Sequence, residues 1–274
     1  MPELPEAETI VRDLRRRVAG RAITHVRVRH ADVLAAPLTA ATLAAGLRGR
    51  RITGVGRRGK NVVFTLDDDE RLVVNLGMTG RLIVSDSPRA QGMRHVAVRF
   101  SLDDGREILY DDVRRFGRIE LHTPESWAER DRALGVEPLS KTFTADRLHA
   151  LTRASRSPIR NWLLDQRHVA GIGNIYANEA LFRAGIHPAR PANSLTRSEA
   201  SRLRDALRDV LEEAITARGT TFSDYRDASG EEGGFEPRLR VYGRAGRPCP
   251  VCGTPIERLV LSNRSAFFCP HCQR

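Results

Sequence analysis

The chain begins with an amine nucleophile beside a carboxylic acid, in the sequence MPELPEAE. Proline after the initiator methionine is small enough that the methionine is normally removed, which leaves Pro2 with a secondary amine. Because an α-amine has a pKa of roughly 8, it is a fair nucleophile at neutral pH. Its attack on a sugar aldehyde carbon gives an iminium, with Glu3 as the acid in the same step. The alternative is that Pro2 and Pro5 only begin a helix, since proline suits the first turn.

All four cysteines lie near the C-terminus, in two Cys-x2-Cys pairs: Cys249 with Cys252, and Cys269 with Cys272. This spacing is typical of a four-cysteine zinc ribbon or β-hairpin finger. Four thiolates leave no open position for water, so we predict one structural Zn²⁺ rather than a catalytic one. His271, inside the second pair, is a competing ligand that the geometry of the pairs disfavours.

The 274-residue chain carries 45 Lys and Arg against 34 Asp and Glu, a formal net charge of +11. Such a balance indicates a polyanionic partner, with nucleic acid as the first candidate. Arginine replaces lysine almost everywhere, and only Lys60 and Lys141 remain. The retention of Lys60 suggests a need for a compact ammonium or for a base that can lose its proton. Chance retention is the alternative.

The N-terminus shows no pattern of a leader or an anchor. It is acidic and lacks the basic-then-apolar order of a signal peptide. No apolar run approaches the length of a membrane span. Since the cysteines also have the spacing of a metal site rather than of disulfides, we expect a soluble, cytoplasmic protein.

Two kinds of element must position these residues. An amphipathic helix is predicted over 3–19, followed by short alternating segments that predict a β-sandwich or barrel. Examples of those segments are 23–29, 61–66, 72–76, 81–84, 96–100 and 106–109. After a hinge near 134–140 the pattern is helical. The predicted helices are 145–152, 158–166, 174–183 and one from Thr196 through Arg218, followed by a loop over 222–238.

Several motifs in a fixed order then support a family resemblance. They are MPELPEAET, GRRGKN at 56–61, NLGMTGRL at 75–82, RRFG at 114–117, LGVEPLS at 134–140, GIGNIYANEALFRAGIHP at 171–188, GTT at 219–221, VYGR at 241–244 and the four-cysteine finger. Over its whole length the chain resembles the formamidopyrimidine-DNA glycosylase/endonuclease VIII family. Within that family it is most similar to the bacterial formamidopyrimidine-DNA glycosylases, also called 8-oxoguanine-DNA glycosylases.

The resemblance implies an α+β multidomain fold. Residues 1–133 form an N-terminal catalytic β-sandwich with an N-terminal helix, and 134–240 a helical DNA-binding domain with a helix–two-turns–helix and a lesion-capping loop. Residues 241–274 form a zinc β-hairpin finger. The implied partner is damaged double-stranded DNA in a basic cleft, bound by a monomer at the nucleoid, with Zn²⁺ as the one bound ion and no membrane association.

The resemblance also implies a base-excision-repair reaction with two stages. Pro2 attacks the sugar of an extruded oxidised purine, the base leaves, and the resulting Schiff base drives β- and δ-elimination of the phosphates. Glu3 is the implied acid/base group. Lys60 contacts the damaged nucleotide and its phosphate, and Arg264 reaches a phosphate from the finger hairpin, unless it is only a solvated arginine.

The implied DNA contacts each have a plainer alternative. Met78, Arg114 and Phe116 fill the gap left by the extruded base, although core packing also explains Met78 and Phe116. Asn174 binds a phosphate at a helix start or only caps the helix. His95 touches DNA or is a solvated loop residue. Glu6 orients the N-terminal region or is only a charge that the helix dipole favours.

Three departures from the family pattern bear on these roles. Val113 stands where the family usually has proline before RRFG, which loosens that loop. Arg160 replaces a common lysine, and we expect phosphate binding to survive. Glu231 and Glu232 make the 222–238 loop more acidic than expected, which affects lesion preference rather than chemistry.

Competing readings of the sequence remain. An endonuclease VIII relative acting on oxidised pyrimidines is disfavoured by MPELPE and by the long 222–238 loop. A non-catalytic zinc protein that binds DNA structure has no reason to keep Pro2, Glu3 and Lys60. A zinc-ribbon RNA-binding protein is disfavoured by an aromatic content of 5%, which leaves few side chains for base stacking.

Overall fold

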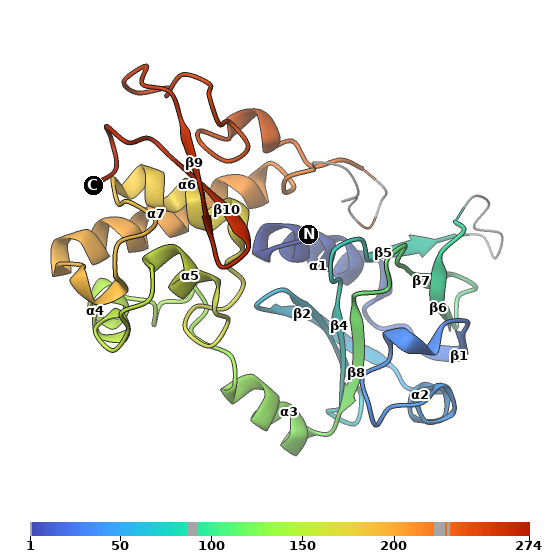
Figure 1. Ribbon diagram of the computed structural model, residues 1–274. Coiled ribbons are helices and arrows are strands. Elements are labelled where there is room, and N and C mark those ends of the chain that lie inside the picture. Colours follow the sequence, from blue (N-terminus) through green and yellow to red (C-terminus); the bar gives the residue numbers. More distant parts are fainter. Residues whose placement is uncertain (1, 87–92, 222–227, 229–230) are drawn as a thin grey trace. The chain divides into compact units, whose positions relative to one another are not determined.

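The computed structural model describes residues 2–86, 93–221, 228 and 231–274. The chain divides into two compact units (Figure 1). The N-terminal unit comprises Met1–Arg132 with Ala217–Gly234, and the C-terminal unit comprises Ala133–Thr216 with Phe235–Arg274. The division into domains at 134 and 241 stays a prediction. No helix among the described residues combines the length and the apolar character that a membrane span requires.

Two antiparallel four-stranded sheets form the frame of the N-terminal unit, in the orders β1-β6-β7-β5 and β2-β3-β4-β8 (Figure 1). The strands of the first sheet are β1 (Ile23–Val28), β5 (Arg81–Ser85), β6 (Val96–Leu102) and β7 (Glu107–Asp111). Those of the second are β2 (Ile52–Arg58), β3 (Asn61–Leu66), β4 (Arg71–Asn75) and β8 (Arg118–His122). The predicted β-sandwich is therefore confirmed.

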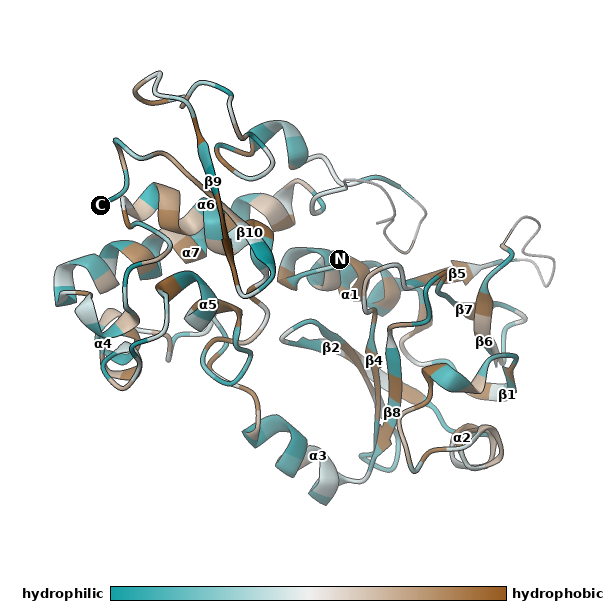
Figure 2. Ribbon diagram, in the orientation of Figure 1, coloured by the Kyte–Doolittle hydropathy of each residue, from teal (hydrophilic) through white to brown (hydrophobic). Residues whose placement is uncertain are grey.

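One apolar core lies between these sheets and includes residues of α1 (Leu4–Val18) and α2 (Ala40–Leu47). Alternate residues of each strand point inward, as the period of two in a strand requires. Val26 and Phe100 come from the first sheet, Phe64 from the second, Leu14 from α1 and Leu43 from α2. Apolar positions, brown in Figure 2, recur along these strands and helices.

The C-terminal unit is helical and ends in a hairpin, as predicted. Its helices are α4 (Ala145–Thr152), α5 (Ile159–Leu164), α6 (Asn174–Ala184) and α7 (Arg197–Thr216), and its strands are β9 (Glu257–Leu261) and β10 (Arg264–Phe268). Thr144 caps α4 by accepting from the Arg147 N–H. Gly185, at φ +70°, ends α6 in the left-handed conformation that glycine tolerates.

Four elements of the N-terminal unit were not predicted: β2, β8, α2 and α3 (Pro124–Arg132). β2 reads ITGVGRR, in which two glycines and two arginines obscure the strand pattern. It forms because it pairs with β3 along its whole length and packs beside α1. The structure thus forms this strand through tertiary pairing, against its local propensity.

Candidate active site

The N-terminus of α1 holds the predicted nucleophile and acid. Pro2 and Glu3 are buried, and Glu3 is the extended residue that precedes the helix. The Glu3 N–H donates to Glu6 Oε2 at 2.8 Å as part of a capping box. The first turn of the helix therefore fixes the direction in which the chain leaves toward Pro2.

Glu6 is a buried carboxylate with a second partner. Its Oε1 accepts the Thr220 N–H at 2.8 Å, and its side chain is only 1% exposed. Gly219 is at φ +86°, and a Cβ there would lie 2.9 Å from Glu6 Oε1. The backbone of the GTT motif at 219–221 therefore packs directly against the Glu6 carboxylate. This contact supports the orienting role inferred for Glu6.

Lys60 stands in the β2–β3 turn beside Gly59, whose φ is +58°. Arg57, which is mostly buried, donates from Nη1 to the Gly59 carbonyl at 2.9 Å and from Nε to Glu8 Oε2 at 3.2 Å. Glu8 belongs to α1. Through this one guanidinium, the turn that carries Lys60 is fixed to the helix that carries Pro2 and Glu3.

Met78, Arg114 and Phe116 lie on two loops of the N-terminal unit, β4–β5 and β7–β8. Met78 is 39% exposed and Phe116 is 54% exposed, so neither packs in the core. The Arg114 guanidinium carbon lies 4.5 Å from the centre of the Phe116 ring. This exposure leaves the apolar side chains available to enter a gap in a duplex.

Asp112 connects these two loops, and sequence reasoning did not identify it. The carboxylate is 1% exposed and accepts the Thr79 hydroxyl at 2.5 Å on Oδ1. Its Oδ2 accepts the Gly117 N–H at 3.0 Å and the Tyr110 hydroxyl at 2.9 Å. Burial and Asp112 raise the pKa of Tyr110, so the phenol stays a neutral donor.

The same network extends to backbone groups of both loops. The Arg114 N–H donates to Thr79 Oγ1 at 3.0 Å, and a Cβ on Gly77 would lie 2.5 Å from the Gly117 nitrogen. Only glycine permits so close an approach, and at φ +59° only glycine adopts this backbone readily. These contacts brace the loop despite Val113, whose side chain is exposed.

A chain of asparagines links the Lys60 turn to the Met78 loop. Asn75 Nδ2 donates to Asn61 Oδ1 at 2.9 Å, and the Gly77 N–H donates to Asn75 Oδ1 at 3.0 Å. Both asparagines lie inside the motifs GRRGKN and NLGMTGRL, which was the signal available in the sequence. The N-terminal unit thus joins these predicted site residues through short polar contacts.

His95 is exposed, as expected for either a DNA contact or a solvated loop residue. Its N–H donates to Asp111 Oδ1 at 3.1 Å, and its carbonyl accepts the Asp112 N–H at 3.1 Å. These bonds fix His95 to the end of β7, next to the Asp112 network.

In the C-terminal unit, α6 and the β9–β10 hairpin position Asn174 and Arg264. Asn174 is the first residue of α6, and its Nδ2 donates to the Ser265 carbonyl at 3.0 Å. Arg264 is exposed at the first position of β10. Ser262 and Asn263 form the turn with φ +45° and +60°, which is the tight primed geometry of a two-residue hairpin.

Arg160 supports this hairpin from beneath. It is fully buried, and its guanidinium donates to the carbonyls of Arg264 at 2.6 Å and Leu261 at 3.3 Å. It also donates to Asn161 Oδ1 at 2.8 Å, and Asn161 Nδ2 reaches Ser262 Oγ at 2.9 Å. Arg160 therefore holds the backbone that carries Arg264, instead of offering its charge to a phosphate as the sequence had suggested.

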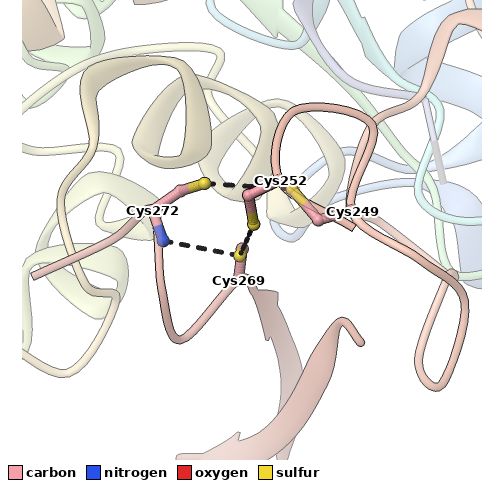
Figure 3. A group of neighbouring side chains, drawn as sticks. All are labelled: Cys249, Cys252, Cys269 and Cys272. Carbon is pink, nitrogen blue, oxygen red and sulfur yellow. Dashed lines mark hydrogen bonds between the residues drawn. The ribbon is translucent and has the colours of Figure 1, made fainter. Parts of the chain in front are cut away.

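The four cysteine sulfur atoms converge at the end of the hairpin (Figure 3). All lie within 4.8 Å of one another, with Cys249 to Cys272 at 3.9 Å and Cys252 to Cys269 at 3.5 Å. A tetrahedral Zn²⁺ with Zn–S bonds of about 2.3 Å requires sulfur atoms about 3.8 Å apart. The thiolate set therefore fits one Zn²⁺, as predicted.

The surroundings of these sulfurs also suit a bound metal. The Val251 N–H donates to Cys249 Sγ and the Cys272 N–H to Cys269 Sγ, both at 3.4 Å. Such backbone donors orient sulfur ligands around a metal. His271 is exposed and is not part of the group of cysteines, so it is no competing ligand.

The finger is built onto α6. Phe182 packs with Val241, Cys249 and Cys269 in one apolar cluster. The fully buried Glu179 accepts three backbone N–H groups, from Arg240, Val241 and Tyr242, each at 2.9 Å. Sequence reasoning did not identify Glu179, whose signal was the single carboxylate within the predicted helix 174–183.

Part of the predicted lesion-capping loop, residues 222–227 and 229–230, lies outside the described residues. Within the N-terminal unit, Pro2, Glu3 and Glu6 share one helix end that is tied to the Lys60 turn, and Met78, Arg114, Phe116 and His95 surround the Asp112 network. Within the C-terminal unit, Asn174 and Arg264 lie on neighbouring elements at the turn end of the β9–β10 hairpin, and the cysteines lie at its other end.

Comparison with known families agrees with this anatomy. Residues 1–119 match the formamidopyrimidine-DNA glycosylase N-terminal domain, and 134–226 match the formamidopyrimidine-DNA glycosylase H2TH domain, a helix–two-turns–helix. Residues 246–274 match a zinc finger found in these glycosylases and in isoleucyl-tRNA synthetases. Together these matches cover most of the chain.

Individual relatives span the whole length. The formamidopyrimidine-DNA glycosylase of Chloroflexus aurantiacus is 43% identical over 273 residues, covering 100% of this chain and 98% of the relative. The Lactococcus lactis enzyme in complex with abasic-site DNA is 32% identical with a TM-score of 0.92, covering 99% of both chains. A Lactococcus lactis variant bound to DNA containing Fapy-dG is 33% identical with a TM-score of 0.92, covering 100% of both chains. With its sandwich, its helical module and its four-cysteine finger all matched in order, the chain belongs to the formamidopyrimidine-DNA glycosylase family.

Proposed function

We propose that this protein is a base-excision-repair DNA glycosylase and AP lyase that removes oxidised purines from double-stranded DNA. The observation that supports this most directly is the buried Pro2-Glu3 terminus, oriented by Glu6 at the start of α1. The solved relatives contain DNA with Fapy-dG or with an abasic site, which correspond to the substrate and the intermediate of such a reaction.

The proposed chemistry needs the free amine of Pro2. The nitrogen attacks the sugar carbon C1′, the bond from C1′ to the damaged base breaks, and the base leaves with the electron pair and gains a proton. The sugar ring opens as its oxygen takes a proton from Glu3, which leaves an iminium between Pro2 and C1′. The positive charge of the iminium acidifies the C2′ proton, and its loss expels the 3′ phosphate. A second elimination expels the 5′ phosphate, and water then releases Pro2.

Other residues of this chain serve the same steps. Lys60, held by the Arg57–Glu8 contact, is proposed to bind the damaged nucleotide and its phosphate. Met78, Arg114 and Phe116 fill the gap in the duplex once the base has left the stack. Asn174 and Arg264 of the C-terminal unit are proposed to bind phosphates of the DNA. His95 of the N-terminal unit is proposed to bind a phosphate as well.

Zn²⁺, held by Cys249, Cys252, Cys269 and Cys272, stabilises the finger and takes no part in the reaction. The conformation of the β9–β10 hairpin depends on the apolar cluster that includes Cys249 and Cys269, and on Arg160. This is the means by which a structural metal supports catalysis.

Trapping with borohydride tests the nucleophile. The enzyme is incubated with a duplex containing 8-oxoguanine opposite cytosine, reduced, and digested, and the cross-linked peptide is mapped by mass spectrometry together with the N-terminus. We expect a single adduct on Pro2, with Met1 removed. An adduct on Lys60 instead would move the nucleophile to that lysine.

Matched variants separate chemistry from binding. Glu3→Gln should lower single-turnover excision by about 10²-fold or more, because a general acid is lost while the side-chain volume is kept. Pro2→Gly should lose most excision and trapping.

The same assay with a thymine glycol duplex compares a pyrimidine lesion with 8-oxoguanine. A clear preference for thymine glycol would overturn the assignment to oxidised purines.

A further inference from the structure

A basic surface lies on the outer face of one sheet of the N-terminal unit. It is a cavity of about 640 Å³ on the sheet β1-β6-β7-β5. His25, Arg27 and Arg29, from β1 and the residue that follows it, line this cavity and are exposed. We call this row of three residues the β1 basic row.

The alternation of side chains places this row on the outer face of the sheet. Val26 and Phe100 point into the core between the sheets, whereas Arg27 and Arg99, which oppose each other across β1 and β6, line the outer cavity. Alternate residues of one strand lie about 6.6 Å apart on the same face. The row is therefore a straight line of cationic and titratable groups.

The carboxylate of the cavity is already neutralised. Among the described residues that line it, Glu107 is the single acid. It accepts from Arg99 Nη1 at 2.9 Å and from Ser101 Oγ at 3.3 Å. In the described part of the chain no carboxylate pairs with Arg27 or Arg29. Two guanidinium groups are thus left with their charge and their donors directed to solvent.

We propose that the β1 basic row binds the phosphate backbone of a second duplex DNA segment. Guanidinium groups are suited to this because their planar donors match phosphate oxygens in pairs. The loops of Met78 and Phe116 project from the ends of the strands, whereas the row lies on a sheet face of the same sandwich. The Arg29 end of the row adjoins the β7–β8 loop, where His30 Nδ1 lies 3.3 Å from Arg115 Nη1, and the row extends from there along β1 to His25.

A row of charges on β1 also has a simpler explanation. β1 is an edge strand, and charged side chains on edge strands prevent edge-to-edge association. That role needs charge of either sign, whereas phosphate binding needs positive charge. Exchange of Arg27 and Arg29 for glutamate preserves the first role and removes the second, so the two explanations are separable by one variant.

The test occupies the first site covalently and then measures the second. The enzyme is trapped by borohydride on a short lesion duplex, purified, and titrated with a fluorescent undamaged duplex while anisotropy is recorded. The wild-type adduct should bind the second duplex. In the R27E/R29E adduct this affinity should fall by about tenfold or more, and the slope of log affinity against log salt should decrease by about 2. Arg16 and Arg48 are exposed and outside the cavity, so R16E/R48E is a control with the same change in net charge.

Each outcome has a distinct meaning. Loss of second-duplex binding in R27E/R29E, with the control and single-turnover excision unchanged, supports the proposal. Equal binding by wild type and variant, or no binding by the wild-type adduct, overturns it and leaves an acidic protein segment as the occupant to test. The inference rests on the proposed function only for the trapping step, and failure to trap is seen before any titration. R27Q/R29Q serves if the glutamate variant does not fold, and it should show the same loss.

Discussion

At the scale of single residues, Asp112 is the side chain that connects the β4–β5 and β7–β8 loops. Asp112→Asn should destabilise the protein by about 1–3 kcal/mol, because an amide nitrogen cannot accept the Gly117 N–H or the Tyr110 hydroxyl in place of Oδ2. Excision should also fall, since Arg114 and Phe116 lose the support of their loop. Denaturant unfolding and single-turnover excision measure the two effects. Tyr110→Phe removes one donor only and is the control with a smaller loss. Full activity of Asp112→Asn would show that the loops are held by other contacts.

At the scale of elements, the hairpin that presents Arg264 is positioned by Arg160. Arg160→Met keeps most of the volume but leaves the carbonyls of Leu261 and Arg264 without their donor. We expect weaker DNA binding and slower excision, while one equivalent of zinc stays bound, because the cysteine cluster does not include this contact. Arg160→Lys should lie between the two, since one ammonium replaces a fork of donors. Loss of zinc from Arg160→Met would instead mean that the arginine supports the whole finger.

The start of α7 offers an element-scale test by pH. Arg190 and Thr196 lower the pKa of Glu199 to about 2, against about 4.3 in an unfolded chain. A lowered pKa in the folded state stabilises the protein above the unfolded value, and that stabilisation is lost as the pH falls through the folded value. The difference in Tm between wild type and Glu199→Gln should therefore be largest near neutral pH and should shrink between about pH 5 and pH 2. A difference that is constant over this range would indicate that the capping hydrogen bonds, not the charge, stabilise the helix.

At the scale of the whole molecule, the two units should respond differently to removal of zinc. The N-terminal unit has its own apolar core, whereas the finger packs through a small cluster that includes Cys249 and Cys269. A chelator should therefore unfold the finger, weaken DNA binding and leave the main unfolding transition of the N-terminal unit in place. Zinc release measured with a chromophoric chelator, calorimetry and DNA titration follow the three effects. Unchanged DNA affinity after complete zinc release would exclude a role of the finger in binding.

The sequence by itself determined the chemistry-bearing residue types and most of the elements. The zinc site was predictable because two Cys-x2-Cys turns leave few geometries for four sulfur atoms, and the structure brings all four within 4.8 Å. The helices of the C-terminal unit were predictable because their caps are local, as in the Thr196–Glu199 box before α7. The strand Asn61–Leu66 was predicted at its observed bounds, and the other predicted strands lie within one or two residues of theirs.

Only the tertiary structure decided which side chains are buried and which are presented. Met78 and Phe116 are apolar, as core residues are, yet both side chains are exposed. The positive φ of Gly77 and the hydrogen bonds of the buried Asp112 fix the conformation of the loops that carry them. Arg160 is of the residue type that binds phosphate, yet its side chain is buried against the hairpin. Its guanidinium donates there to two carbonyls that lie 101 and 104 residues away in the sequence. The physical reason is the same in each case. Periodicity and caps are set by neighbours in sequence, whereas the partners of a buried polar group are set by contacts between distant segments, which a local pattern does not contain.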